Sequence, residues 1–110
     1  MRIDKQTNGE TLIVRLDGEL DEHTAQKMRE AVQESLGDEI TRLVLNLHGV
    51  TFIDSSGLGA ILGRFREISQ RNGRMCLVSV NPQVRHILEL AGVLKIMPLY
   101  RSETRALEEA

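Results

Sequence analysis

The chain has 110 residues, which predicts a single compact domain spanning residues 1–110. Hydrophobic residues make up 41% and charged residues 27%, a composition typical of globular proteins and not of disordered ones. The formal net charge is −2, and the only aromatic residues are two Phe and one Tyr. Nucleic-acid binding needs a basic face and often stacking aromatics, so we expect no nucleic-acid partner.

The N-terminal segment is polar and charged, and no apolar run approaches the roughly 18 residues expected of a membrane span. We therefore expect a cytoplasmic protein without a secretory signal or a membrane partner. The single cysteine, Cys76, lies within the apolar run Met75 to Val80. Its position predicts a buried, unreactive thiol.

The first elements are two strands joined by a hairpin. Asn8-Gly9 favours a type I′ turn, in which both central residues take positive φ. The turn follows a short strand around Ile3 and precedes a strand over residues 11–17, where apolar and polar residues alternate.

An acidic loop is expected over residues 18–22, and the apolar period then changes to that of a helix. The helix is predicted from Thr24 to Leu36, with Gly37 as its stop. The uninterrupted apolar run Leu43 to Leu45 predicts a strand covered on both faces.

A second helix is predicted from about Asp54 to Arg71, ended by Asn72-Gly73, and a strand is expected over residues 75–80. Asn81 and Pro82 then indicate an N-cap and a first helical residue.

That third helix ends at Gly92, and a last strand is predicted over residues 95–99. Pro98 cannot donate to a strand ladder, so this strand should lie at a sheet edge or end at the proline. Ser102 can cap a short terminal helix. The resulting order, ββαβαβαβα, predicts an α/β domain with a mixed, mainly parallel five-stranded sheet and about four helices.

The segment Thr51 to Gly59, at the start of the second helix, is the most informative candidate site. Asp54, Ser55 and Ser56 are residue types that cap helices by accepting backbone N–H bonds. A helix N-terminus also favours phosphate, because its unpaired N–H groups and its dipole attract negative charge. The residues therefore permit either simple capping or a serine that accepts phosphate.

The second helix also carries small residues on one side. At about 100° per residue its large apolar side chains share one face, and Gly59, Ala60 and Gly63 fall on the opposite face. Glycine inside an exposed helix costs roughly 1 kcal/mol of stability relative to alanine, so the two glycines on this face require an explanation. Close approach by a partner and internal packing against another element both supply one.

Other chemistries fit less well. The glycines do not have the spacing of a dinucleotide-binding loop, and no esterase elbow is present. An ATPase phosphate loop would need Lys followed by Ser or Thr after its last glycine, where this chain has Arg64-Phe65. The three histidines lie far apart, without the pairing typical of zinc sites. We expect no enzyme activity, no cofactor and no metal. The acidic residues Glu19, Asp21 and Glu22 suggest a solvated loop, with Asp21 as a helix cap, or an acidic rim beside Asp54.

The sequence resembles the STAS-domain anti-sigma factor antagonists, with the sporulation antagonists of spore-forming bacteria as the nearest match. The resemblance rests on TFIDSSGLGAILG (residues 51–63), on GELD (residues 18–21) and on NPQVRHILELAGVLKI (residues 81–96). These motifs occur in the family's order over nearly the whole chain. The resemblance implies a single STAS domain and a regulatory protein that is not an enzyme.

For this family the resemblance implies a phosphorylation switch. The unphosphorylated antagonist binds an anti-sigma factor that is also a serine kinase, and thereby releases a sigma factor. The kinase phosphorylates one serine, which ends binding, and a serine phosphatase resets the protein. The acceptor is the first serine after the aspartate, which corresponds to Ser55, with Ser56 as its neighbour.

On this hypothesis Asp54 orients the acceptor loop, Asp21 contributes to the rim, and the small residues form a flat docking surface. The predicted partner-binding residues are Asp21, Asp54, Ser56, Gly57, Gly59, Ala60 and Gly63.

The main alternative is a STAS module that senses a small ligand or a nucleotide, with a phosphate held noncovalently near Ser55. A phosphoaspartate receiver is a third possibility, but the chain lacks an acidic pair after its first parallel strand, and Asp54 lies several residues beyond Leu47. A hydrolase would need a convergent nucleophile and base, which the spacing does not indicate.

Overall fold

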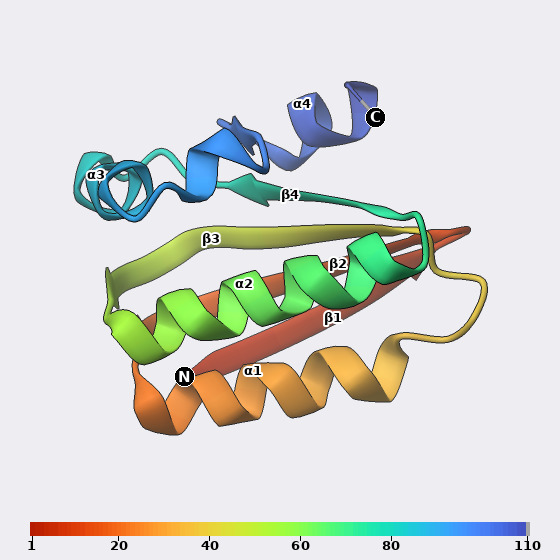
Figure 1. Cartoon of the computed structure of the whole chain (residues 1–110), viewed down its shortest axis with the longest axis horizontal. Helices are drawn as coiled ribbons and strands as arrows, with labels where there is room; N and C mark the ends of the chain where they lie inside the picture. The colour runs from red at the N-terminus through yellow and green to blue at the C-terminus, as the bar shows by residue number, and fades with distance from the viewer. Residues whose placement is uncertain (110) are drawn as a thin grey trace.

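The computed structural model describes residues 1–109 and contains one five-stranded sheet (Figure 1). The strands lie in the order in which they occur along the chain, with β1 antiparallel to β2 and the other neighbours parallel. This confirms the mixed, mainly parallel sheet. The strands are β1 (Arg2–Asn8), β2 (Thr11–Leu20), β3 (Arg42–Ile53), β4 (Arg74–Val78) and β5 (Leu99–Tyr100).

Helices follow each parallel strand, as right-handed crossovers require. Two of them, α1 and α2, lie side by side on one face of the sheet (Figure 1). The order ββαβαβαβα is confirmed, with one 3₁₀ turn added before β5. The helices are α1 (Glu22–Ser35), α2 (Ser55–Gln70), α3 (Pro82–Leu90), η1 (Val93–Lys95) and α4 (Glu103–Glu108).

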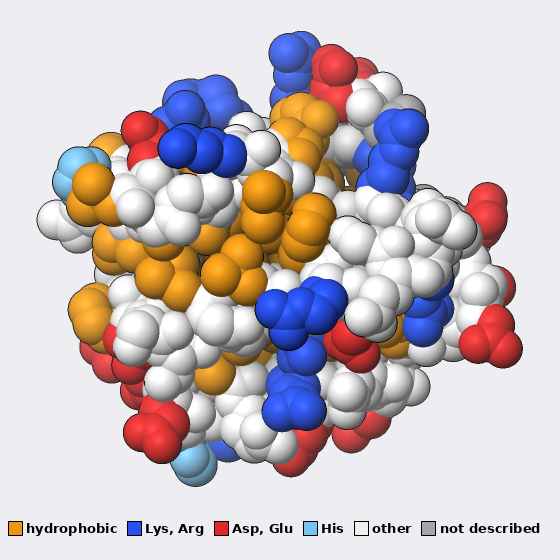
Figure 2. Space-filling model, in the orientation of Figure 1, with side chains coloured by type: hydrophobic (Ala, Val, Ile, Leu, Met, Phe, Trp, Pro, Cys, Tyr) orange, Lys and Arg blue, Asp and Glu red, His pale blue; other side chains and the backbone are white. Residues whose placement is uncertain are grey.

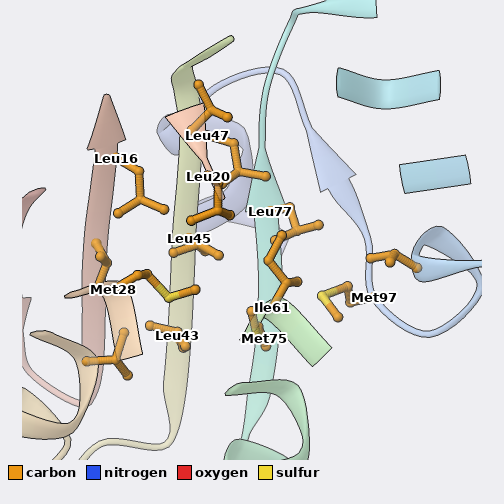
Figure 3. Packing of buried hydrophobic residues seen from close by; sticks show 14 of the residues in the cluster. Leu16, Leu20, Met28, Leu43, Leu45, Leu47, Ile61, Met75, Leu77 and Met97 are labelled. Carbon is orange, nitrogen blue, oxygen red and sulfur yellow. The ribbon is translucent and has the colours of Figure 1, made fainter. Parts of the chain in front are cut away.

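The main core lies between the sheet and α1, α2 and α3. Alternate residues of the three central strands point toward these helices and are completely or almost completely buried (Figure 3). Ile61 and Ile68 of α2 and Met28 of α1 fill the opposite side. The fully buried members of this core are aliphatic, and close packing of aliphatic side chains fills a protein interior without aromatic residues. The strand residues include Leu12, Val14, Leu43, Leu45, Met75 and Leu77.

The other face of the sheet carries a smaller cluster beneath α4. Ile13, Val44 and Cys76 pack there against Ala106. Cys76 is buried, as predicted, and burial raises the pKa of its thiol to about 11. The thiol is therefore protonated at neutral pH, which is consistent with an unreactive cysteine.

The hairpin turn differs from the predicted one. Asn8 pairs with Thr11, so the two loop residues are Gly9 and Glu10, and only Gly9 takes a positive φ, at 61°. Glycine at the first central position followed by a negative φ is the pattern of a type II′ turn, not type I′.

Two strands are longer than predicted. The expected loop over residues 18–22 is wrong, because β2 continues to Leu20 and pairs there with Ile53 at the end of β3. Gly18, at φ 122°, lies beside an irregularity in this ladder and lets the strand continue past it. β3 likewise extends eight residues past the predicted Leu45, to Ile53.

The last strand begins where it was expected to end. Residues 93–95 form a 3₁₀ turn, and β5 starts directly after Pro98. Pro98 provides only its carbonyl to the ladder, where it accepts the N–H of Leu77 at 2.9 Å. β5 is an edge strand, as proposed, but it is only two residues long.

One polar network anchors α4 to the sheet. Arg15 of β2 donates two hydrogen bonds to the Glu103 carboxylate, at 2.7 and 2.8 Å, and Asn46 of β3 donates a third at 2.6 Å. The Arg15 hydrogen bond, opposed by burial and supported by Asn46, lowers the pKa of Glu103. A lowered pKa in the folded state means that this carboxylate stabilises the fold above its unfolded pKa and stops doing so as pH falls through the folded value.

We expect Glu103→Gln to lower the free energy of unfolding by about 1 kcal/mol at pH 7, a modest loss because Arg15 remains 37% exposed and water screens the pair. The difference from the unsubstituted chain should disappear in acid, once Glu103 is protonated. Urea unfolding at a series of pH values measures this, and Glu108→Gln, on the exposed side of α4, is the control. A loss of unfolding free energy that does not change with pH would contradict a stabilising role for the Glu103 charge.

Candidate functional site

The candidate site lies where β3 passes into α2. β3 ends at Ile53 and α2 begins at Ser55, so Asp54 alone forms the junction. The residues between Leu47 and Asp54 thus belong to β3, and Asp54 directly follows the strand. Its N–H donates to the carbonyl of Leu20, at 3.1 Å, and its Oδ1 accepts the N–H of Gly57, at 2.9 Å. Asp54 is thus the N-cap of α2, held to the end of β2.

The two serines differ in exposure. Ser55 is the first residue of α2 and is exposed, whereas Ser56 is half-buried and lines a groove between α1 and α2. Both belong to the first helical turn, where the helix dipole favours negative charge. Ser55 is the more accessible hydroxyl for a phosphoryl donor.

Gly57 has a structural role, which the sequence alone did not distinguish from a role in binding a partner. It is buried, and a Cβ at this position would clash with the carbonyl oxygen and the side chain of Leu20. Other atoms of the domain cover this position, which gives Gly57 a role in folding; its predicted contact with a partner stays a prediction. Glycine allows α2 to start against the end of β2.

Gly59 and Gly63 are different, because a Cβ at either position would meet nothing within 4 Å. This excludes internal packing, the alternative left open by the sequence. With Ala60 they line a groove of about 470 Å³ between α1 and α2. The other side chains that line it come from both helices and include Glu22, Ala25, Gln26, Arg29 and Gln70.

Arg64 is a groove residue that the sequence analysis missed. Its side chain is only 7% exposed, and its Nε lies 2.6 Å from Oε1 of Glu67, an ion pair without the angles of a hydrogen bond. Arg64 stands three residues after Ile61 and four before Ile68, on the buried face of α2. This spacing is the signal in the sequence that could have revealed its burial.

Of the acidic residues expected to form a rim, all but Glu19 line the same depression. Asp21, Glu22 and Asp54 line one depression of about 760 Å³, next to His23 and Lys27. Asp21 caps α1: its Oδ1 accepts the N–H of Thr24 at 3.0 Å, and its own N–H donates to the Thr24 hydroxyl at 2.8 Å. The hydrogen bonds from Thr24 lower the pKa of Asp21, so this part of the rim is negative at neutral pH.

Two of the N–H groups at the N-terminus of α2 already donate to its N-cap residue. The N–H of Gly57 goes to the Asp54 carboxylate, and the N–H of Leu58 goes to the Asp54 carbonyl. A free phosphate would have to approach beside this carboxylate. The arrangement offers an exposed hydroxyl more directly than it offers a noncovalent anion site.

Within residues 1–109 the structure contains no group of three or more metal-ligating side chains, and no helix of that range is long and apolar enough to cross a bilayer.

Comparison with known proteins agrees with this architecture. The STAS domain family profile matches residues 2–106. The chain belongs to the STAS domain family. A relative from Paenibacillus polymyxa, named anti-sigma F factor antagonist, is 43% identical over 110 residues, which cover 99% of this chain and 94% of the relative.

Two solved structures of SpoIIAA extend the likeness. The unphosphorylated form of this anti-sigma factor antagonist has a TM-score of 0.84 and 30% identity, covering 98% of this STAS domain and 95% of that chain. The phosphorylated form, described as a Bacillus cell fate determinant, has a TM-score of 0.77 and 29% identity, covering 98% of both. These relatives are named for antagonism of an anti-sigma factor and not for an enzymatic reaction.

Substitution by alanine should stabilise the domain at two of the three glycines of α2 and destabilise it at the other. We expect Gly59→Ala and Gly63→Ala each to stabilise the domain by up to about 1 kcal/mol, because the methyl group meets no atom and alanine favours the helix. Gly57→Ala should destabilise it, because the methyl group meets the Leu20 carbonyl. Thermal and urea unfolding of the three variants test this, and equal effects at all three positions would refute the distinction.

Proposed function

We propose that this STAS domain is a cytoplasmic anti-sigma factor antagonist that acts in sporulation. Its unphosphorylated form binds an anti-sigma factor with serine kinase activity and so frees a sigma factor. Phosphorylation of Ser55 ends the binding, and a serine phosphatase restores it. The observation that carries this proposal is an exposed serine at the first position of α2, beside a groove whose glycines face open space.

The docking surface consists of the groove residues Ser56, Gly59, Ala60 and Gly63, with Asp21 and Asp54 on the rim. Glycine lowers the helix propensity at positions 59 and 63, and no contact inside the domain requires a glycine at either position. Their absent side chains would let the backbone of a partner approach α2 closely. Asp54 would act through the cap, by fixing the position of the first turn that carries Ser55.

Charge accounts for the switch. A phosphoserine brings about −1.5 to −2 charges at neutral pH, and Ser55 directly follows Asp54, close to an acidic rim. In the free protein the helix dipole and water offset the repulsion. In a docked complex, two like unit charges about 4 Å apart repel by about 4 kcal/mol at an effective dielectric of 20, which corresponds to roughly a thousandfold in affinity.

Such a switch needs no refolding. SpoIIAA has been solved in phosphorylated and unphosphorylated forms, and this chain shares its fold with both. The β3–α2 junction supports the same view, because Asp54 and Gly57 tie the first turn of α2 to the end of β2. The added charge would therefore act on the interface and leave the backbone in place.

The chemistry of transfer belongs to the partner on this proposal. Phosphoryl transfer requires a nucleotide site and bound metal ions, and the groups that hold ATP are supplied by the kinase. This chain needs only to present a hydroxyl in the right position. Ser55 does so from a rigid helix end.

Phosphorylation is tested by incubating the chain with a cognate anti-sigma factor kinase and ATP, followed by peptide mass spectrometry. We expect one phosphate on Ser55, no labelling of Ser55→Ala, and normal labelling of Ser69→Ala, a serine at the far end of α2. Labelling of Ser56, or of Ser55→Ala, would refute the assignment.

The docking surface is tested by Gly63→Trp. The position is open, so the indole should leave the free energy of unfolding within about 1 kcal/mol while weakening binding of the kinase at least about tenfold by occupying the groove. Gln33→Trp, at an exposed position of α1 outside the groove, is the control and should bind the kinase like the unsubstituted chain. Unchanged affinity of a folded Gly63→Trp variant would contradict docking in this groove.

A further inference from the structure

A further cavity lies at the opposite end of α2 from Ser55. It has a volume of about 310 Å³, at the lower end of the range typical of small-ligand sites. It lies between the end of α2, the start of β4 and the segment that leads to β5. Figure 2 shows apolar side chains gathered over this part of the face, with basic side chains around them. The apolar lining consists of Phe65, Met75, Cys76, Ile96, Pro98, Tyr100 and Ala106.

The cavity exists because β5 is short. Along β4 the N–H groups of Leu77 and Ser79 point toward the β5 segment, so by alternation the N–H and C=O of Met75 point to the same edge. The ladder with β5 covers only Leu77 and Val78. Pro98 has no N–H to offer the Met75 carbonyl, so the ladder stops and the edge at Met75 opens into the cavity.

Polar groups surround this apolar pocket on the solvent side. Arg74 is exposed and takes part in none of the ion pairs found among residues 1–109. Arg42 donates to the carbonyls of Ala106 and Leu107 at the end of α4. Ser69 adds a hydroxyl, and Glu109 adds the single carboxylate. The buried part of the lining is therefore apolar. The charged groups around the opening are two arginines and one glutamate, which leave one net positive charge.

We propose that this cavity binds a small amphipathic carboxylate, such as a medium-chain fatty acid. The apolar tail would occupy the space between Phe65, Met75 and Ile96, and the carboxylate would accept hydrogen bonds from Arg74. Ile96 is 47% exposed, so the tail would remove apolar surface of the protein from water. A charge-assisted hydrogen bond to arginine would fix its orientation.

An extended peptide fits this place less well. Addition of a strand depends on a run of free backbone groups along a sheet edge. Here the free edge is Met75 alone, because the N–H of Gly73 already donates to Ile68 at 2.9 Å and Leu77 pairs with the β5 segment. One residue cannot hold a strand in register, whereas it can line a pocket for a small molecule.

The site is separate from the proposed switch. Ser69, at the cavity, lies fourteen residues after Ser55 on the same helix, about 21 Å along its axis. Ligand binding can therefore be measured on the unphosphorylated chain without any partner protein. A failure of this inference would leave the proposed function of Ser55 unaffected.

The test is titration of the ¹⁵N-labelled chain with octanoate, followed by amide chemical shifts and calorimetry. We expect saturable binding, with shifts confined to the cavity segments around Phe65, Met75 and Ile96. Arg74→Gln should weaken binding roughly tenfold through the lost charge-assisted hydrogen bond. Ser69→Trp, at an exposed position on the rim, should block the pocket.

The matched control is Arg101→Gln, an exposed arginine outside the cavity, which should bind octanoate like the unsubstituted chain. Octanol should bind more weakly than octanoate, because it lacks the negative charge. Absence of saturable binding at millimolar octanoate would overturn the proposal. So would equal binding by octanol, shifts scattered over the domain, or a folded Ser69→Trp variant with unchanged affinity.

Discussion

The pairing of β2 with β3 is the interaction on which the candidate site depends. The two strands run parallel up to Leu20 and Ile53, and only there does the chain turn into α2. The Leu20 carbonyl accepts the N–H of Asp54 and at the same time limits residue 57 to glycine. The end of one strand therefore determines where the helix begins and which hydroxyl it exposes. Ser55 is presented by the first turn of a helix that follows the strand directly, and not by a loop.

Glycine serves two opposite purposes within one helix. At Gly57 the missing side chain makes room for the domain's own backbone, whereas at Gly59 and Gly63 it leaves space that nothing in the domain fills. The first use concerns folding, and the second reduces helix stability without a gain in packing. A STAS domain that acts by presenting a surface needs this separation, because the same helix must be held firmly on one side and remain accessible on the other.

Proline has a comparable effect at the other end of the molecule. Pro98 ends the ladder between β4 and β5, so the edge of β4 at Met75 has no strand paired with it. The two ends of α2 thus face different surroundings: an acidic, polar rim near Ser55 and an apolar pocket with a basic mouth near Ser69. The small core and its few aromatic residues are sufficient for such a domain, since its two candidate sites lie at its surface.

The sequence by itself determined the class of fold, the order of the elements and the caps at Asp21, Asp54, Asn81 and Ser102. These features depend on local hydrogen bonding and on the period of apolar residues, which neighbouring residues alone can reveal. Tertiary structure decided what depends on contacts between distant segments. The lengths of β2 and β3 follow from their mutual pairing, and the roles of Gly57 and Gly63 follow from what lies next to each. A one-dimensional pattern contains no information about those neighbours, because they come from other parts of the chain.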